Sequence, residues 1–333
     1  MNIIIIRPCA IGDLIVTLPT IGAIRNHFHN AHIEIMGYPT YLELVKGRFY
    51  ADSVSRFDHA DVAPLFVKNV RIPLETMKRF GNTDQVISFV SDREGVFIAN
   101  IRAAGAGNVI YYESFPIDEQ GIHIADHFLK LLDRMSINSS FRMPKIFLSH
   151  DDVLSGSAFI KSRVADFQKT LVVVHPGSGS RQKCWPVERY AELIAWLNDK
   201  MNAQVIVVAG HADDDVIEKL RMKVKSVIVA DRLPLPALAA VIKQCALFVG
   251  NDSGITHIAA ALGIKTVAIF GPVDPDLWAP LGEQVKVIYK RLDCSPCLPD
   301  VRRDCCHQVC LEHVTVEDVI SEIKSFNGHF QLP

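Results

Sequence analysis

The chain has 333 residues, of which 49% are hydrophobic and 22% are charged, and its formal net charge is −2. This composition is typical of a globular protein with two average domains, and the balanced charge excludes binding of nucleic acid through bulk positive charge. No stretch approaches the roughly 20 apolar residues of a membrane-spanning helix, and no basic segment precedes an N-terminal apolar run as in a signal peptide. We therefore expect a cytoplasmic protein.

The first half opens on a run of β-branched residues at 2–8, which predicts a buried strand. An amphipathic helix is expected from about Leu14 to Phe28. Further strands, separated by helical stretches, are expected at 32–38, 54–59, 85–90 and 108–112. A polar segment around 145–169, in which we predict little helix, joins this half to the next.

The second half alternates strictly between strands and helices. Strands are predicted at 170–175, 204–210, 226–231, 247–252 and 266–271. Helices are predicted from Pro186 to about Asn198 and at 213–223, 234–244, 254–262 and 316–326. Continuous Val and Ile runs indicate strands buried on both faces, so the alternation predicts a doubly wound parallel sheet. We predict an α/β protein of two Rossmann-like domains, 1–155 and 156–333, whose last helix is a candidate to pack back on the first domain.

The loop HPGSGSRQKCWP follows one of these strands. Its glycines permit close approach of the backbone, and exposed N–H groups of such loops bind anions. The candidates for a phosphate contact in this loop are Gly177, Ser178, Gly179, Ser180 and Lys183. The sequence is neither a Walker loop nor GxGxxG, so an ordinary mobile surface loop stays open as the alternative.

The segment FVGNDSGITHIAAALG runs from a buried strand into a helix. The first N–H groups of that helix carry the positive end of its dipole, which predicts a site for a pyrophosphate. The candidate contacts are Asp252, Ser253, Gly254, Thr256 and His257. In the alternative interpretation Asp252 is an ordinary N-cap and His257 is structural.

The segment CAIGDLIVTLP has the equivalent position in the first domain. Gly12 is expected to make the turn, and Asp13 lies at the helix start. Asp13 is either a helix-capping or first-turn acid, or a carboxylate in the cleft opposite the phosphate site. A phosphate site on one domain and a carboxylate on the other predict group transfer from an activated phosphate donor.

Five of the eight cysteines crowd the segment CSPCLPDVRRDCCHQVC. They are Cys294, Cys297, Cys305, Cys306 and Cys310. With His307 they are candidates for a structural zinc, but only one CxxC is present and no standard paired pattern fits, so a thiol-rich loop is favoured.

A separate acidic cluster begins at Asp213. Asp213 or His211 is a candidate contact of a ribose, and a solvated helix start is the favoured alternative.

Four fragments in order, RPCAIGDLIVTLP, HPGSGSRQKCWPVERY, GNDSGITHIAAALGIKTVAIFGPVDP and the cysteine-rich tail, resemble the heptosyltransferases of glycosyltransferase family 9. The resemblance covers nearly the whole chain. It implies GT-B architecture: two Rossmann-like domains facing a central cleft, with a nucleotide-sugar donor on the C-terminal domain and the acceptor on the N-terminal one. It implies Asp13 as the base, Lys183 on the donor phosphates, and the motif from Asp252 to His257 at the donor.

The implied reaction is an inverting glycosyl transfer to a lipopolysaccharide core or related glycan. The favoured sugar is heptose, and the favoured donor is ADP-heptose. The acceptor side is the least transferable part, and there we place Gly12 and Arg7. A lipid-linked acceptor implies peripheral contact with the inner face of the inner membrane. The cations that can meet its phosphates are Arg7, Arg56, Lys68, Arg71, Lys78, Arg79 and Arg93, for which ordinary surface charge is the alternative.

No DxD pair stands at a donor position, so we expect no metal ion and no cofactor besides the donor substrate. Two other classes of function stay open. An NAD-type oxidoreductase or sugar-nucleotide epimerase uses Rossmann units too, although GxGxxG is missing after either opening strand. A non-catalytic nucleotide-binding protein on the same fold is the other alternative, because fold alone does not establish activity.

Overall fold

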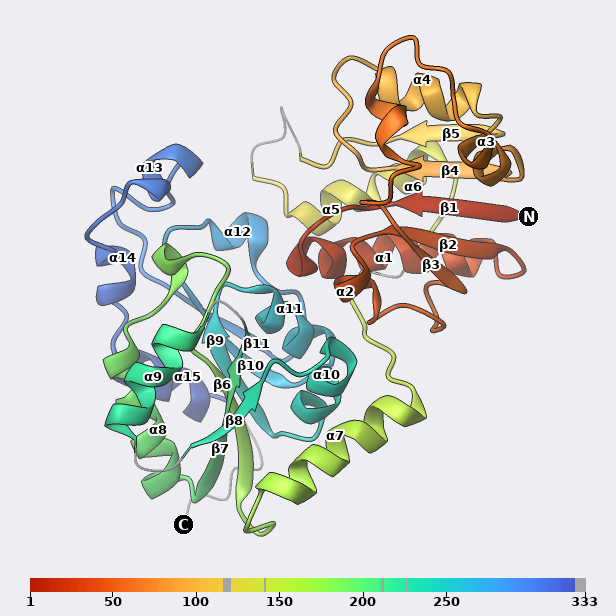
Figure 1. Ribbon diagram of the computed structural model, residues 1–333. Helices are drawn as coiled ribbons and strands as arrows, with labels where there is room; N and C mark the ends of the chain where they lie inside the picture. The colour runs from red at the N-terminus through yellow and green to blue at the C-terminus, as the bar shows by residue number, and fades with distance from the viewer. Residues whose placement is uncertain (116–120, 141, 211–212, 225–226, 327–333) are drawn as a thin grey trace. The chain divides into compact units, whose positions relative to one another are not determined.

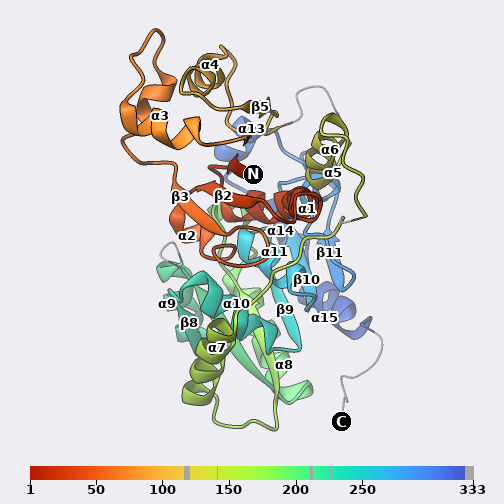
Figure 2. The same ribbon diagram turned by 90° about the vertical axis from the view of Figure 1, so that its right-hand side faces the viewer.

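A computed structural model describes residues 1–115, 121–140, 142–210, 213–224 and 227–326. The chain divides into two compact units, Met1–Arg142 and Met143–Pro333. Each unit is built on one parallel β-sheet with helices on both of its faces (Figures 1 and 2). The predicted α/β fold with two Rossmann-like units is therefore confirmed.

The first unit has a five-stranded sheet in the order β3-β2-β1-β4-β5. Its strands are β1 (Asn2–Ile6), β2 (His32–Gly37), β3 (Ser53–Arg56), β4 (Gln85–Ser88) and β5 (Asn108–Tyr111). Its helices are α1 (Ile11–His27), α2 (Pro39–Leu42), the 3₁₀ turn η1 (Ala63–Phe66), α3 (Leu74–Gly81), α4 (Val96–Ala103), α5 (Ile124–Leu129) and α6 (Leu131–Arg134). The strand order reverses direction between β1 and β4.

The central strand β1 is buried on both faces, as its run of isoleucines predicts. Ile3, Ile4, Ile5 and Ile6 are each no more than 4% exposed. Ile4 and Ile6 pack in a cluster with residues of η1, α3 and α4, so these elements cover one face of the sheet. Because side chains alternate along a strand, Ile3 and Ile5 point to the other face.

The second unit has a six-stranded sheet in the order β11-β10-β9-β6-β7-β8. Its strands are β6 (Thr170–His175), β7 (Ala203–Ala209), β8 (Ile228–Asp231), β9 (Leu247–Asn251), β10 (Lys265–Phe270) and β11 (Val285–Tyr289). Its helices are α7 (His150–Arg163), the 3₁₀ turn η2 (Arg181–Lys183), α8 (Val187–Lys200), α9 (Asp214–Lys223), α10 (Leu235–Lys243), α11 (Gly254–Ala261), α12 (Pro275–Trp278), α13 (Pro299–Arg303), α14 (Val309–Glu312) and α15 (Val316–Lys324). This is the doubly wound order of a dinucleotide-binding sheet, and it reverses between β6 and β9.

The last helix, α15, packs on the second unit. Its Val316, Val319 and Ile323 belong to one buried cluster with side chains of α8, α9 and the strands β6, β7, β9 and β10. Figure 1 shows α8, α9 and α15 on one side of this sheet and α7, α10 and α11 on the other. The structure thus places α15 in the core of its own unit, where its apolar stripe is buried.

The segment predicted to contain little helix holds the 14-residue helix α7. Ser149 caps its first turn and Asp152 completes a capping box, a signal that the polar composition of the segment conceals. Helix α7 packs on α10 and belongs to the second unit, which begins at Met143. A boundary after residue 155 would cut through this helix, so the division falls earlier than we expected.

Gly156 is the point of closest approach between α7 and α10. A Cβ atom at this position would lie 2.7 Å from both the carbonyl carbon and the Cβ of Ala240. Backbone atoms of a packed helix cannot give way, so overpacking outweighs the better helix propensity of alanine. We expect Gly156→Ala to lower the free energy of unfolding by about 1–2 kcal/mol.

Urea unfolding followed by tryptophan fluorescence measures this effect in the right unit, because the three tryptophans, Trp185, Trp196 and Trp278, all belong to the second unit. Ser155→Ala is the matched control, since Ser155 is the neighbouring exposed residue of the same helix. Equal unfolding midpoints for the two variants would contradict the predicted steric conflict.

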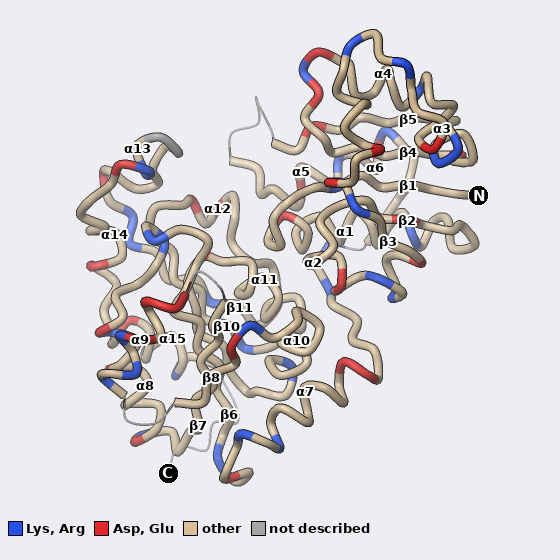
Figure 3. The backbone as a smooth tube through the Cα atoms, in the orientation of Figure 1, with Lys and Arg blue, Asp and Glu red and all other residues tan. Residues whose placement is uncertain are grey.

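None of the helices described is long and apolar enough to cross a membrane. Basic and acidic residues are interspersed along the backbone of both units (Figure 3). This mixture agrees with the nearly neutral formal net charge of −2.

Candidate functional site

The two segments predicted to bind phosphate lie at the carboxyl ends of neighbouring strands. The loop HPGSGSRQKCWP follows β6, and Asp252 follows β9, which pairs with β6 in parallel. The strand order of the sheet reverses between these two strands. Ligands of doubly wound sheets bind at this reversal, because the flanking loops separate there and leave room at the strand ends.

The loop is fixed to the protein interior by Asn251, which is fully buried. The Asn251 Nδ2 group donates to the carbonyls of Pro176 and Gly177, at 2.8 and 3.1 Å. Its Oδ1 atom accepts from the Trp185 N–H at 3.0 Å and from the Tyr190 hydroxyl at 2.9 Å. One amide side chain therefore joins both ends of the loop to β9, and the alternative of a free surface loop is wrong for this part of it.

Gly177 is needed because a carboxylate lies against its backbone. A Cβ atom there would lie 1.9 Å from Asp213 Oδ1, which no rotamer change of a side chain at position 177 can avoid. Gly179 has open space around the corresponding position. Of the two glycines predicted to admit an anion, Gly177 is therefore explained by Asp213, while Gly179 leaves the loop surface unobstructed.

The two serines of the loop make internal hydrogen bonds. The Ser178 hydroxyl donates to the carbonyl of Asp252 at 2.8 Å, which links the loop to the second phosphate segment. The Ser180 hydroxyl donates to Gln182 Oε1 at 2.6 Å. Both hydroxyl protons are thus committed within the protein in this structure, so the serines support the shape of the site before they contact any anion.

Lys183 and Asp252 form an ion pair. The Lys183 ammonium lies 2.7 Å from Asp252 Oδ2, and the exposed fractions of the two side chains are 23% and 8%. The lysine comes from η2 and the aspartate from the end of β9, so the pair connects the two predicted phosphate segments. An ammonium group has three protons, and the pair with Asp252 aims the lysine while leaving protons for a second anionic partner.

The N-terminus of α11 has the capped geometry of an anion-binding helix start. Ser253 is its N-cap, and the Ser253 hydroxyl accepts from the Thr256 N–H. Gly254 and Ile255 occupy the first two helical positions, whose N–H groups have no acceptor inside a helix. His257 lies one turn in and is 5% exposed. Ser253 directly follows Asp252, the ion-pair partner of Lys183, so the start of α11 lies next to the lysine in this site.

Asp213 is buried and not the solvated helix start that we favoured. It is 5% exposed, its Oδ2 accepts from the Gly210 N–H at 2.8 Å, and it lies 3.6 Å from His175 Nε2. Burial raises the pKa of the Asp213 carboxyl, but the bonds from His175 and Gly210 lower it by more, so the pKa is below its usual value. These contacts occupy the carboxylate that we considered for a ribose, and the alternative candidate His211 lies outside the described residues.

His175 and Asn251 are the residues that sequence reasoning missed. His175 is 4% exposed, and its Nδ1 atom lies 3.1 Å from the Ser253 hydroxyl. Each of the two is the last residue of a strand, and the residues directly before it are buried. A polar residue at the carboxyl end of a buried parallel strand is the signal that marks such positions.

Asp13 lies in the first turn of α1, after β1, next to the reversal of strand order in its own sheet. Ala10 and not Asp13 is the N-cap, and the side chain of Asp13 is half-buried. The Asp13 carbonyl accepts from the Thr17 hydroxyl at 2.6 Å. Gly12 is the second residue of the helix, so it does not make the turn that we predicted: α1 begins at Ile11, earlier than expected.

Arg7 is buried behind this helix start. It is 3% exposed, its Nε donates to the Thr17 hydroxyl at 3.1 Å, and its Nη1 donates to the Ser114 hydroxyl at 3.1 Å. The guanidinium also lies over the rings of Phe128 and Phe89, at 4.6 and 5.4 Å. The residue we placed on the acceptor side therefore supports α1 from inside the unit.

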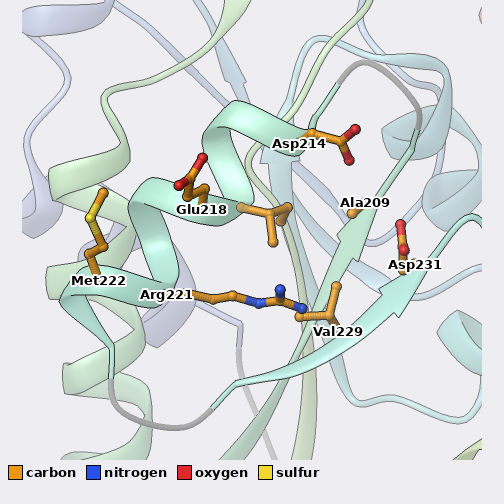
Figure 4. Close-up of a pocket in the computed structure, with 8 residues that line it drawn as sticks. Ala209, Asp214, Glu218, Arg221, Met222, Val229 and Asp231 are labelled. Carbon is orange, nitrogen blue, oxygen red and sulfur yellow. The ribbon is translucent and has the colours of Figure 1, made fainter.

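A cavity of about 510 Å³ lies between α9 and the neighbouring strands β7 and β8. Its lining residues are Ala209, Asp214, Ile217, Glu218, Arg221, Met222, Val229 and Asp231. Figure 4 shows the Asp214 and Asp231 carboxylates at the end near Ala209, with the Arg221 guanidinium beside Val229. The predicted donor contacts do not line this cavity, which is a separate feature of the described structure.

The cysteine-rich segment packs against the carboxyl end of β10. The Cys297 N–H donates to the Pro272 carbonyl at 2.8 Å, and burial and neighbouring thiols raise the pKa of the buried Cys310 thiol to about 11. All eight cysteines are free thiols. Within the described part of the chain, no group of three or more His, Cys, Asp or Glu side chains is arranged to hold a metal ion.

Comparisons with known proteins identify the family of this chain. Residues 113–307 match the model of glycosyltransferase family 9 (heptosyltransferase). Lipooligosaccharide heptosyltransferase 2 of Campylobacter jejuni is 24% identical over 343 residues, which cover 98% of this chain and 99% of that protein.

Two solved structures share the fold. The family 9 glycosyl transferase of Veillonella parvula has a TM-score of 0.79 at 19% identity, covering 97% of this chain and 96% of that chain. The E. coli ADP-heptose lps heptosyltransferase II has a TM-score of 0.75 at 18% identity, covering 98% of each chain. The matches favour glycosyl transfer over the oxidoreductase and the non-catalytic alternatives. The chain belongs to glycosyltransferase family 9 and is a glycosyltransferase.

Proposed function

We propose that this enzyme transfers heptose, with inversion, from ADP-heptose to a lipopolysaccharide core or related glycan. The observation that carries the proposal is the meeting of Lys183, Asp252 and the N-terminus of α11 where the strand order reverses. The names of two similar proteins support the choice of sugar and product: one is a lipooligosaccharide heptosyltransferase and the other an ADP-heptose lps heptosyltransferase.

In this proposal the donor diphosphate lies at the N-terminus of α11. Its oxygens accept from the N–H groups of Gly254 and Ile255 and from the Lys183 ammonium. Negative charge grows on the diphosphate as the bond to the anomeric carbon breaks. Donors aimed at the growing charge are worth about 3–4 kcal/mol each in the transition state.

The second group of the mechanism is Asp13. An acceptor hydroxyl attacks the anomeric carbon from the face opposite the leaving diphosphate, so the configuration inverts. Asp13 takes the hydroxyl proton, and the nucleoside diphosphate leaves with the electron pair of the broken bond. A carboxylate is a weak base toward an alcohol, so we expect the proton to move late, when bond formation has made the hydroxyl acidic.

We propose further that no divalent ion takes part. Lys183 and the N–H groups of α11 supply the positive charge that a metal provides in other transferases. Turnover in excess EDTA is expected to equal turnover in added Mg²⁺ or Mn²⁺, measured by the release of nucleoside diphosphate. Loss of activity in EDTA that Mg²⁺ restores would contradict this part of the proposal.

The acceptor is proposed to be lipid-linked, so the enzyme would work in peripheral contact with the inner face of the inner membrane.

Two measurements test the function as a whole. The first is a thermal-shift comparison of ADP-, GDP- and UDP-sugars, in which ADP-heptose is expected to raise the melting temperature most, by mass action. The second is ADP release, which is expected only when a lipopolysaccharide core or related glycan acceptor is present. Stabilisation by another nucleotide sugar alone would overturn the proposed donor.

A further inference from the structure

A chain of buried hydrogen-bonding groups lies beneath the donor-phosphate site and has no part in the mechanism above. It runs from Asp213, at the start of α9, through His175, at the end of β6, to Ser253, the N-cap of α11. The three side chains are 5%, 4% and 9% exposed. Asp213 lies against Gly177 of the loop, and Ser253 caps the helix, so the chain joins the two halves of the site.

The hydroxyl protons of this chain can be counted. Thr256 Oγ1 donates to the Asn251 carbonyl, which can only accept, so the single hydroxyl proton of Thr256 is used there. The contact of 3.0 Å between Ser253 Oγ and Thr256 Oγ1 must then use the proton of Ser253. With its proton committed, Ser253 can only accept from His175 Nδ1 at 3.1 Å, and this requires a proton on Nδ1.

The other ring nitrogen faces a carboxylate. His175 Nε2 lies 3.6 Å from Asp213 Oδ2. An ionised carboxylate is a pure acceptor, so a proton on Nε2 matches it and a bare nitrogen would repel it. The pKa of Asp213 is below its usual value despite burial, because His175 and the Gly210 N–H lower it, so this carboxylate is ionised near neutral pH.

Other titratable groups of the described residues also lie close to this chain. The Tyr190 hydroxyl, whose proton is donated to Asn251 Oδ1 at 2.9 Å, lies 3.3 Å from the His175 carbonyl, and burial raises the pKa of Tyr190 well above the usual value. Burial and the Asp213 carboxylate raise the pKa of Cys184 to about 11. Asp252, next to Ser253, is paired with Lys183 at 2.7 Å. Asp213 is thus the carboxylate that faces the ring.

We propose that His175 is a doubly protonated positioning residue, whose imidazolium links Asp213 to Ser253 and so holds the phosphate loop and the N-terminus of α11 in the geometry that binds a diphosphate. The binding role rests on the proposed function, since it takes a diphosphate as the ligand. The protonation state rests on the hydrogen bonds of Ser253 and Thr256 and on the ionised Asp213 carboxylate 3.6 Å from Nε2. His175 does not touch the reacting atoms and acts through Ser253.

Nuclear magnetic resonance of protein labelled with ¹⁵N in its histidines tests the protonation state directly. The signal of His175, among 13 histidines, is identified by its loss in His175→Asn. Both ring nitrogens of the wild type are expected to carry a proton at pH 7. Asp213→Asn is expected to leave one nitrogen bare, and Asp214→Asn, which removes the adjacent exposed carboxylate paired with Arg232, is the matched control and should resemble the wild type. A wild-type ring with one bare nitrogen overturns the proposal even if Asp213→Asn does not fold.

Calorimetric titration with ADP and with adenosine tests the positioning role. His175→Asn and Asp213→Asn are expected to weaken the binding of ADP roughly tenfold to a hundredfold, as for a lost charge-assisted hydrogen bond. The affinity for adenosine is expected to stay unchanged, because adenosine has no phosphate. Equal weakening of both ligands, or unchanged ADP affinity, overturns the role. Failure of the wild type to bind ADP would contradict the proposed donor and not the role of His175. The nuclear magnetic resonance result would still decide whether the His175 ring carries one proton or two.

Discussion

Replacement of Asp13 by asparagine is expected to lower turnover roughly 10²–10⁴-fold, the range that a positioned general base contributes. Asparagine has nearly the shape of aspartate but cannot accept the acceptor's hydroxyl proton. The half-buried side chain in the first turn of α1 is expected to keep its place, so the fold should survive. Donor affinity should survive too, because the proposed diphosphate contacts belong to residues of the second unit.

Two measurements separate these effects: single-turnover transfer for the chemical step, and ADP titration for the donor. Asp126→Asn is the matched control, since Asp126 is an exposed acid in the first turn of another helix of the same unit, α5. If Asp13→Asn turns over like the wild type, Asp13 is not the base. If it loses ADP binding in proportion to turnover, its role lies in the donor site.

Replacement of Lys183 by methionine is expected to cost roughly 10²–10³-fold in kcat/KM, as for one well-aimed donor to the growing charge. The same replacement is also expected to lower the stability of the protein, because it breaks the ion pair with Asp252. Asp252 is 8% exposed, so without the ammonium its carboxylate is left buried and unpaired. An unpaired buried charge is strongly destabilising, so the melting temperature should fall as well.

The double variant Lys183→Met with Asp252→Asn separates stability from function. Removing the orphaned charge is expected to restore much of the melting temperature, whereas activity should stay low because the cation is still missing. Arg181→Met is the control within the same loop, since Arg181 is 88% exposed and pairs with the exposed Asp215. Recovery of activity in the double variant, or an equal loss in Arg181→Met, would show that Lys183 does not act on the diphosphate.

The parts of the fold that sequence reasoning predicted are those that local pattern determines. The strand 170–175 was predicted with the bounds that the structure has, because a continuous apolar run marks a strand buried on both faces. Helix α7 escaped prediction because its buried residues, Asp152, Gly156 and Ile160, include only one large apolar side chain. Its interior contact is a glycine packed on a backbone, which hydrophobic periodicity does not reveal.

The candidate site, too, was predicted in part by local sequence pattern. The sequence by itself determined which residues end strands and begin helices, and so it brought Lys183, Ser253 and Asp13 forward as candidates. The partners of these residues come from elsewhere in the chain: Asp252 for Lys183, and His175 with Asp213 for Ser253.

Only the tertiary structure decided these partnerships, because β6, β7 and β9 become neighbours through crossovers that bury their helices on both faces of the sheet. The periodicity of side chains along one strand or helix carries no information on which strand lies beside it. The sequence therefore determined the elements and the chemistry at their ends, and the order of the strands decided which of those ends meet.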